Sequence, residues 1–422
     1  MLTTLAGPVT RLARRYTFLL TSLAVILCPA TLLAAYPSLP DIPLVNDYGV
    51  FARAQGMGGA HVAACEDISA LFFNPAGLAL LKRPELAVGL SHLTSEISTT
   101  WSGNTLLSSA GATRLNSLGM AYPFPTFRGS FVVAGGYGRP NSMDYDYART
   151  SGSENILVTE RGGAGPLAGG VAVDVSPNVS VGGSFQILSG SSRRTFLDEY
   201  PLAPVESLST RERIDDSDIS GWGLSLGALF KAGKPFKAGI TVQFPQHYFF
   251  EGTQTVTETR LGHVTQDSLS SYEEVRFEDE ITLPFSFSSG ISFSVPYLTL
   301  AFDASYTDWT ELDYAGPLKV GNFYAYKPTV DLRFGQELTL PWLPVRLRAG
   351  YAIEPISYKL LLGDEATIVK DKTVFSAGAG IILEDSITLD VAYTQSSFER
   401  AIAGFSEKDT AKKLFLSFAY RF

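Results

Sequence analysis

After residue 85 the chain repeats one pattern, an alternation of apolar and polar residues with a period of two. In FSFSSGISFSV, residues 285–295, aromatic or aliphatic residues alternate mainly with serine, and LTLAFDASYT, residues 298–307, follows the same rule. Such alternation places one set of side chains on each face of a β-strand. We predict fourteen strands, near residues 86–98, 113–125, 129–140, 165–178, 179–198, 219–232, 236–258, 276–295, 298–314, 327–340, 344–358, 370–384, 387–402 and 410–422.

An even number of alternating segments of about ten residues is typical of an all-β fold, the transmembrane antiparallel β-barrel. Short turns are predicted near 123–129, 176–178, 232–235, 295–296, 340–344 and 384–386, and longer polar loops near 99–112, 141–164, 199–218, 259–275, 315–326, 359–369 and 403–409. Periplasmic turns and extracellular loops produce this alternation of lengths. A soluble β-sandwich also alternates apolar and polar residues, but it gives no reason for the unequal connections.

The first 35 residues have the order of a secretory signal peptide. Three arginines (Arg11, Arg14, Arg15) precede an apolar run at 18–27, and small residues follow as far as Ala35. Cleavage is predicted after Ala30 or Ala35. An anchoring transmembrane helix is the alternative, but the run is short and Pro29 interrupts it. No later stretch has 18 consecutive apolar residues, so the exported chain is either soluble or a membrane barrel.

Composition argues against several classes of function. Charged residues make up 18% of the chain, below the roughly 25% of a soluble globular domain, and the net charge of −9 gives no basis for nucleic-acid binding. The four histidines are far apart and lack metal-ligand spacing, so we expect no metal or cofactor. Cys65 is the single cysteine after residue 35 and has no evident base nearby. No catalytic grouping stands out, so we do not predict an enzyme.

The last residues form an amphipathic strand that ends on an aromatic residue. On one face lie Leu414, Leu416, Phe418, Tyr420 and Phe422. This ending resembles the signal read by the outer-membrane barrel assembly machinery. We therefore expect that machinery as a partner during biogenesis, and the outer membrane of a Gram-negative bacterium as the location. Outer-membrane lipid and lipopolysaccharide would surround a monomeric barrel.

If the apolar faces meet lipid, the alternate residues line the lumen. The charged residues that would then point inward are Asp303, Asp331, Arg333, Arg346, Arg348 and Asp390. They form either a charged track for solutes or a ladder of cross-strand pairs. We favour the ladder, because both signs of charge occur on nearby strands.

Residues 36–85 lack the alternation and are predicted to lie in the lumen as a hatch. The predicted organisation is therefore a signal peptide at 1–35, the hatch at 36–85 and the barrel at 86–422. An apolar segment of this size needs a partner, and a fourteen-stranded barrel is wide enough to hold it. The glycines suit a tight backbone, Asp67 can cap a helical turn, and Asn74-Pro75 would end it. The candidate gating residues are Gly56, Gly58, Gly59, Asp67, Asn74, Pro75, Ala76 and Gly77.

Two runs of the hatch resemble the N-terminal hatch of the FadL-type outer-membrane transporters, which carry long-chain fatty acids or aromatic hydrocarbons. They are AQGMGGA at 54–60 and EDISALFFNPAGL at 66–78, in which Asn-Pro-Ala-Gly is the family's best marker. YTDWT at 306–310 resembles a late-strand pattern of that family. Length, strand count and terminal phenylalanine agree over the whole chain after the signal peptide. A barrel of the type IX protein secretion system has a similar hatch and is the alternative.

The resemblance implies passive uptake of a hydrophobic ligand, a long-chain fatty acid or a similar apolar compound. The ligand would land on extracellular loops, meet the hatch and leave sideways beside a kinked third strand. Gly135 and Gly136 are candidates for this lateral opening, because paired glycines favour a bulge, although glycine on a barrel wall also makes room for neighbours. Candidates for the landing loop, or for contacts within that loop, are Phe196, Leu197, Tyr200 and Leu202. The tryptophans, including Trp309, are expected in interfacial belts.

Overall fold

The computed structural model describes residues 49–140, 142–151, 154–202, 207–233, 235–261, 268–315, 324–362, 365–366, 368–402 and 404–422. The predicted signal peptide and residues 36–48 of the predicted hatch lie outside these residues. Across the described ranges, no helix is long and apolar enough to cross a membrane.

Most of the described chain is β-strand. The strands are β1 (Glu85–Trp101), β2 (Asn104–Phe124), β3 (Phe131–Gly138), β4 (Tyr145–Ser151), β5 (Glu154–Ser176), β6 (Val179–Leu202), β7 (Ser207–Ala232), β8 (Phe236–Gln243), β9 (Gln246–Leu261), β10 (Ser268–Leu283), β11 (Ser286–Val295), β12 (Leu298–Thr307), β13 (Asp313–Ala315), β14 (Tyr324–Tyr326), β15 (Thr329–Thr339), β16 (Val345–Glu354), β17 (Tyr358–Leu362), β18 (Glu365–Ala366), β19 (Ile368–Leu383), β20 (Ile387–Ile402) and β21 (Phe405–Arg421).

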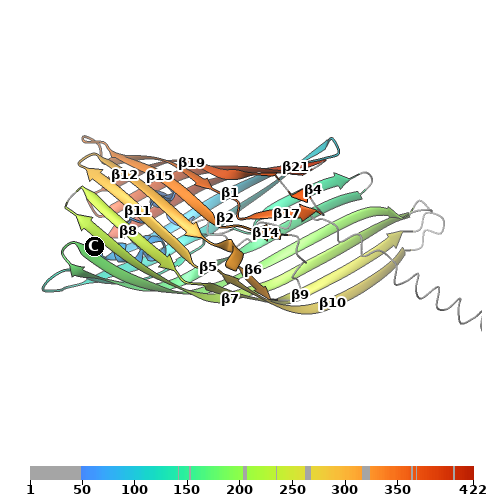
Figure 1. Cartoon of the computed structure of the whole chain (residues 1–422), viewed down its shortest axis with the longest axis horizontal. Helices are drawn as coiled ribbons and strands as arrows, with labels where there is room; N and C mark the ends of the chain where they lie inside the picture. The colour runs from blue at the N-terminus through green and yellow to red at the C-terminus, as the bar shows by residue number, and fades with distance from the viewer. Residues whose placement is uncertain are drawn as a thin grey trace, which may run out of the picture. The chain divides into compact units, whose positions relative to one another are not determined.

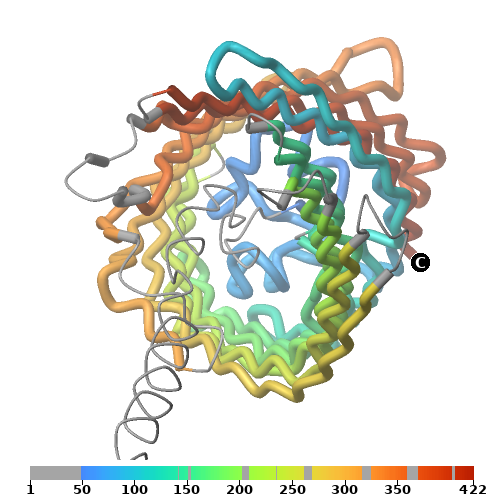
Figure 2. The backbone as a smooth tube through the Cα atoms, turned by 90° about the vertical axis from the view of Figure 1, so that its right-hand side faces the viewer, coloured from blue at the N-terminus to red at the C-terminus, as the bar shows by residue number. Residues whose placement is uncertain are grey.

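The strands form a closed antiparallel barrel (Figure 1; Figure 2). The ring closes where β1 pairs with β21, from Glu85↔Arg421 to Trp101↔Phe405. Some strands are interrupted, so that β3 with β4, β8 with β9, and β10 with β11 each make one crossing, and the short strands β13, β14, β17 and β18 are not counted as separate crossings. Counted this way, fourteen strands cross, and each predicted segment overlaps one of them. The prediction of a fourteen-stranded barrel is confirmed.

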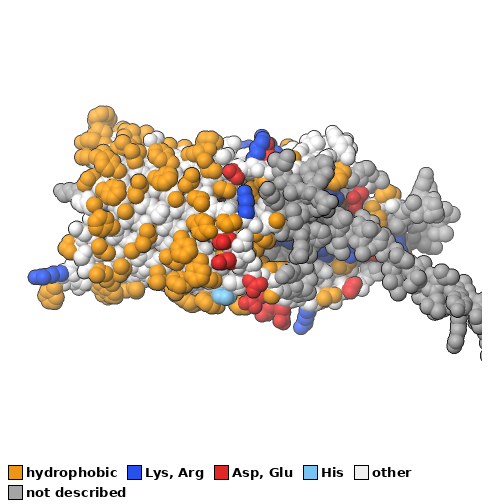
Figure 3. Space-filling model, in the orientation of Figure 1, with side chains coloured by type: hydrophobic (Ala, Val, Ile, Leu, Met, Phe, Trp, Pro, Cys, Tyr) orange, Lys and Arg blue, Asp and Glu red, His pale blue; other side chains and the backbone are white. Residues whose placement is uncertain are grey.

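The alternation in the sequence sets the two faces of the wall. On β11, Phe287 and Phe293 are 49% and 45% exposed, whereas Ser292 is 1% exposed and faces inward. Figure 3 shows hydrophobic side chains gathered over the half of the barrel that carries the C-terminus, with charged side chains at the border. Such a broad apolar band is expected against lipid rather than water.

The strands run further than predicted on the side opposite the short turns. β5 and β6 pair as far as Asn155↔Glu199, and β7 and β9 as far as Leu208↔Leu261. The loops predicted near 141–164, 199–218 and 259–275 therefore contain long stretches of strand, and that expectation was wrong. The outer parts, such as STRERIDDSD at 209–218, are polar on both faces, so no alternation marks them as strands.

Residues 49–84, here called the inner segment, lie inside the ring of strands (Figure 2, blue). The segment contains the short helices α2 (Ala52–Gly56) and α3 (Ala70–Phe73) and the 3-10 helix η2 (Pro75–Leu80). α2 packs against β16, β19, β20 and β21, and η2 packs against β5, β6 and β7. Ile68, Leu71 and Leu78 are almost fully buried in a cluster with alanines of the wall. The protein's main apolar core therefore joins the inner segment to the barrel.

Candidate functional site

Asn74 anchors the inner segment to the wall. Its side chain is fully buried, and its Oδ1 accepts a hydrogen bond from the backbone of Ala76 at 3.1 Å, at the turn that Pro75 begins. Its Nδ2 donates to the carbonyl of Val62 at 2.9 Å and to that of Ala228, on β7, at 3.2 Å. One side chain therefore ties two parts of the inner segment to the barrel.

Glycines on both sides allow the inner segment to approach the wall closely. Gly58 and Gly59 have φ angles of 66° and 75°, which glycine adopts without strain. A Cβ on Gly350 of the wall would lie 2.2 Å from Gly58 N, and one on Gly227 would lie 2.0 Å from Asn74 Oδ1. A Cβ on Gly335 would lie 2.4 Å from Met57 O, one on Gly182 2.5 Å from Pro75 C, and one on Gly290 2.9 Å from Val62 Cβ. At these positions the wall fits the inner segment because it has no side chain there.

The remaining predicted hatch residues also make tight contacts. A Cβ on Gly77 would lie 2.3 Å from Cys65 Sγ. The Gly56 carbonyl accepts a hydrogen bond from Ser376 Oγ of β19 at 3.2 Å. Ala76 is buried in a small cluster that includes Leu229 of β7. The structure thus brings the predicted hatch residues together at the interface between the inner segment and the wall.

Arg53 connects the inner segment to a row of luminal charges. Its guanidinium lies 2.9 Å from Asp67 Oδ2 and 3.2 Å from Glu337 Oε2. Glu337 in turn lies 2.7 Å from Arg348, which lies 2.6 Å from Asp390. Opposite charges thus alternate from the inner segment across β15, β16 and β20.

Two carboxyl groups of the inner segment have lowered pKa values. Burial alone would raise the pKa of Asp67, but His61, Arg53 and Ser69 outweigh burial and hold that pKa well below its ordinary value. Burial also raises the pKa of Glu66, and the ion pair with Lys237 together with Arg53 lowers it on balance. Both groups are therefore charged at neutral pH.

The predicted luminal charges face inward and are paired. Asp303 accepts hydrogen bonds from the backbone of His61 at 2.5 Å and of Val62 at 2.8 Å. Arg333 lies 3.1 Å from Asp331 and 2.9 Å from Glu354. These contacts fit the interpretation of the charges as a structural ladder rather than a track for solutes.

The third crossing strand is interrupted between β3 and β4. β3 pairs with β2 up to Ser117↔Gly138, whereas β4 pairs, within the described ranges, with β5 alone. β4 still packs on β1 and β2, and its Tyr147 is buried. The paired register between β2 and the third crossing strand therefore ends at Gly138. One more backbone hydrogen bond follows, from Arg139 N to the Asn116 carbonyl at 2.7 Å, and the next residue, Pro140, has no backbone N–H to donate.

Gly135 and Gly136 do not form this interruption. Both stay in continuous register with β2 and β5. A Cβ on Gly136 would lie 2.8 Å from the Leu118 carbonyl and 3.5 Å from Leu71 Cδ2 of the inner segment. The structure places the break in pairing a few residues later. Gly135 and Gly136 therefore make room for neighbouring atoms and do not bend the strand.

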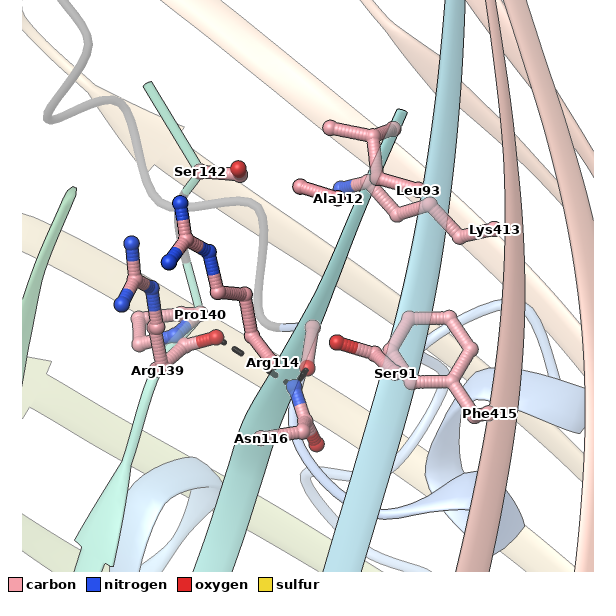
Figure 4. A pocket seen from close by; sticks show the side chains of 11 residues that line it. Ser91, Leu93, Ala112, Arg114, Asn116, Arg139, Pro140, Ser142, Lys413 and Phe415 are labelled. Atoms are coloured by element: carbon pink, nitrogen blue, oxygen red, sulfur yellow. Dashed lines mark hydrogen bonds between the residues drawn. The ribbon is translucent and has the colours of Figure 1, made fainter. Parts of the chain in front are cut away.

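A partly open cavity, with about 340 Å³ of empty space that includes open solvent, lies at the strand break (Figure 4). Leu93, Pro140 and Phe415 supply much of its apolar lining, and Gly49 of the inner segment also borders it. Arg114 of β2 lies 2.6 Å from Asp144, just before β4, and so bridges the gap between the two strands. We call this space the break cavity.

Asn116 joins the strand break to the inner segment. It occupies a bulge of β2, since Leu115 pairs with Leu90 and Ser117 with Gly89. Its buried Oδ1 accepts from Phe51 N at 3.1 Å, and its Nδ2 donates to the carbonyls of Gly49 and Arg139. Sequence reasoning missed this residue, because no motif or spacing marks it.

An apolar track crosses the lumen toward the break. Successive strands contribute one buried cluster, which contains Trp309, Leu283, Tyr248, Ile219, Leu188, Ala164 and Met143. Met143 lies in the interruption between β3 and β4. At the other end, Asp308 Oδ1 accepts from Thr310 N at 3.0 Å, capping the short helix η3 (Trp309–Glu311) that carries Trp309. Trp309 is thus luminal, and its expected place in an interfacial belt was wrong.

The predicted landing residues do not form one loop surface. Phe196, Leu197 and Tyr200 lie on the outer part of β6, which pairs with both β5 and β7. As neighbours on a strand, Phe196 and Leu197 point to opposite faces. The Arg213 guanidinium lies 3.8 Å from the centre of the Phe196 ring, and Tyr200 donates to Glu258 at 3.2 Å. Leu202 ends β6. The loop placement was wrong, because strand pairing extends through this polar region.

Sites for other chemistry are not evident. The stretch GLSLG at 223–227 has the Gly-x-Ser-x-Gly pattern of serine hydrolases. It lies inside β7, paired with its neighbours, instead of at a turn from strand to helix. In the described part of the chain, no group of three or more His, Cys, Asp or Glu side chains could hold a metal ion.

Comparisons with known proteins place this fold. A family model described as "Outer membrane protein transport protein (OMPP1/FadL/TodX)" matches residues 44–420. The comparison with curated proteins found no match. A solved Pseudomonas aeruginosa FadL homologue is 16% identical, with a TM-score of 0.65 over 88% of this chain and 98% of that chain.

Two further solved structures share the architecture. The P. putida toluene transporter TodX is 14% identical, with a TM-score of 0.67 over 89% of this chain and 99% of that chain. The Ralstonia pickettii toluene transporter TbuX is 13% identical, with a TM-score of 0.62 over 89% of this chain and 99% of that chain. At these identities the likeness shows the fold alone. Because the family model spans nearly all of the barrel and the inner segment, the chain belongs to the OMPP1/FadL/TodX family, whose members are outer-membrane transport channels of Gram-negative bacteria.

Proposed function

We propose that this barrel takes up hydrophobic ligands passively and releases them sideways into the membrane between β2 and β4. The observation that carries the proposal is the end of the β2–β3 ladder at Ser117↔Gly138. Where the ladder of backbone hydrogen bonds is continuous, as between β1 and β21, it would block lateral passage. Beyond this point side-chain contacts such as Arg114–Asp144 bridge β2 and β4, and these can separate without unpairing a strand.

The apolar track supports a hydrophobic ligand. Its side chains run from Trp309 to Met143, so a ligand would stay in apolar surroundings until it reached the break cavity. The resemblance seen in the sequence suggested long-chain fatty acids or similar apolar compounds. TodX and TbuX, which share the fold, are named toluene transporters. We therefore propose small aromatic compounds as well as fatty acids as ligands to test first.

We propose that the first residues of the inner segment act as the gate. The later part is held by Asn74, by the close approach of wall glycines and by the Arg53 ion pairs. Gly49 and Phe51 are hydrogen-bonded to Asn116, Phe51 also packs in the apolar core beside Phe72, and Ala52 N donates to Ser417 Oγ of β21 at 2.8 Å. Movement of residues 49–51 would open the break cavity while the rest of the inner segment stays docked.

A reversible cross-link across the gap tests the lateral exit. In the double variant Arg114→Cys and Asp144→Cys, a cleavable bis-maleimide reagent would replace the ion pair. Transfer of labelled toluene and of a labelled fatty acid into proteoliposome lipid should stop on cross-linking and resume after cleavage. Native Cys65 is fully buried and should not react.

The matched control is Glu96→Cys with Lys412→Cys, which replaces an ion pair of 2.9 Å across the intact β1–β21 ladder. Cross-linking there should leave transfer unchanged. Undiminished transfer in the cross-linked Arg114/Asp144 variant would reject lateral release at this break. The alternative, a scaffold for protein secretion, has no support in the family match, and a stable protein partner would be needed to favour it.

A further inference from the structure

We propose that the lumen holds a second ligand site, lined by residues of β8 to β12, η3 and β15, for a small neutral aromatic compound that carries one hydrogen-bond donor, such as a phenol. The proposal rests on the proposed uptake of hydrophobic ligands and narrows the class of ligand. It is carried by a cavity that is distinct from the break cavity.

This cavity is partly open, with about 460 Å³ of empty space that includes open solvent, and it has one apolar and one polar side. Leu283, Pro284 and Trp309 form most of the apolar side, and two of them begin the apolar track. The polar side includes Gln246 and Asp331. An occupant would therefore have both a place for a polar group and a continuous apolar path toward the break.

Several donors around the cavity already have acceptors. Thr307 Oγ1 donates to Ser286 Oγ at 3.0 Å, and Trp309 Nε1 donates to Thr329 Oγ1 at 3.1 Å. The Asp331 carboxylate accepts a hydrogen bond from the Arg333 guanidinium at 3.1 Å. A carboxylate can accept several hydrogen bonds, and the Asp331 side chain is 26% exposed, so it can accept another from a ligand. The cavity consequently presents an acceptor to a ligand.

The negative charge of Asp331 determines which polar group of a ligand can bind at this acceptor. The Arg333 guanidinium is shared between Asp331 and Glu354, at 3.1 and 2.9 Å, so its positive charge is matched by two carboxylates. A ligand carboxylate would meet the like charge of Asp331. A pure hydrocarbon would displace water from the polar side of the cavity and could not replace the hydrogen bonds that the water made there. A phenol can pack its ring on Trp309 and Leu283 while its hydroxyl donates to Asp331.

Binding to the purified full-length barrel tests this assignment. Phenol, toluene and benzoate share one ring and carry a hydroxyl, a methyl or a carboxylate. Titration calorimetry against detergent blanks should show phenol binding about tenfold or more tightly than either of the others, the effect of one charge-assisted hydrogen bond. This comparison needs no variant and so does not depend on a variant folding.

The variant Asp331→Asn removes the charge and keeps the size of the side chain. It should weaken phenol binding about tenfold and narrow the preference for phenol over benzoate. The control Asp216→Asn makes the same change at an exposed carboxylate that pairs with Arg193, and should leave all three affinities unchanged. Equal binding of phenol and toluene, equal binding of phenol and benzoate, or an unchanged phenol affinity in Asp331→Asn would each overturn the proposal. Those failures would leave lateral release standing, since the cross-link at Arg114 and Asp144 tests it separately.

Discussion

Replacing Asn116 by alanine is expected to release the first residues of the inner segment while the rest stays docked. The substitution removes one acceptor, used by Phe51 N at 3.1 Å, and one donor group, used by the carbonyls of Gly49 and Arg139. Asn116 and Phe51 are both buried, so water cannot readily replace these bonds. The side chain makes no contact that would be needed for closure of the barrel between β1 and β21.

The size of the effect follows from the number of bonds. Two of the three bonds, those to Phe51 and Gly49, hold the inner segment. Each intramolecular hydrogen bond contributes about 0.5–1.5 kcal/mol net, so losing these two favours the released state by about 1–3 kcal/mol. Because about 1.4 kcal/mol is a factor of ten, the released population should rise roughly 5- to 140-fold. Permeation of a hydrophobic ligand should rise as well, since Gly49 and Asn116 both border the break cavity.

Hydrogen exchange at Ala52 measures the release. The amide of Ala52 donates to Ser417 Oγ, so the substitution does not remove its acceptor, and faster exchange must come from movement of the segment. The control Asn155→Ala makes the same change at an exposed position and should leave exchange at Ala52 unaltered. A folded Asn116→Ala barrel with wild-type exchange at Ala52 would refute the coupling between the strand break and the inner segment.

Three other outcomes can be measured. Gly227→Ala places a Cβ only 2.0 Å from Asn74 Oδ1 and should lower the stability of the docked segment by about 1–3 kcal/mol in thermal denaturation. Gly135→Ala, whose Cβ would lie 3.9 Å from the Ala168 carbonyl, should leave that stability unchanged. The docked structure lowers the pKa of Asp67, so the ion pair of Asp67 stabilises docking above the ordinary carboxyl pKa of about 4, and this stabilisation is lost as the pH falls below that value. Hydrogen exchange in α3, corrected for intrinsic rate, should therefore be constant from about pH 5 to 8 and rise below about pH 4. A rise near pH 6 would contradict this expectation. Cys65 is buried and burial raises its thiol pKa, so maleimide should label it only after unfolding; labelling during ligand transport would show that the whole inner segment moves.

The sequence was informative wherever lipid touches the protein. A strand with one face in lipid and one in the lumen must alternate apolar and polar residues. The sequence of 285–295 therefore predicted both the strand and which side chains face lipid. The outer halves of β6 and β7 carry polar residues on both faces, and no alternation in their sequence distinguishes a strand from a loop. Phe196 and Leu197 were misplaced for that reason.

The candidate site was harder to predict, because one residue type serves several physical roles. Gly135-Gly136 suggested a bend, yet Gly136 makes room for Leu71, and the break in pairing comes with Pro140 instead. Pro140 was the available signal, since proline lacks the donor that a ladder needs. Asn116 acts through partners distant in the chain, and no local pattern could have identified it.

The close fit between the inner segment and the wall glycines has a consequence for the order of assembly. At Gly182, Gly335 and Gly350 the two backbones touch with no space for a side chain, so a peptide could not be threaded past them once the ring is complete. The strands that complete the ring are β1, which directly follows the inner segment, and β21, the last strand of the chain. The inner segment must therefore be in place before the final strand pairs with the first. A barrel made from residues 86–422 alone would close without it, and adding the missing peptide afterwards should not restore the native packing.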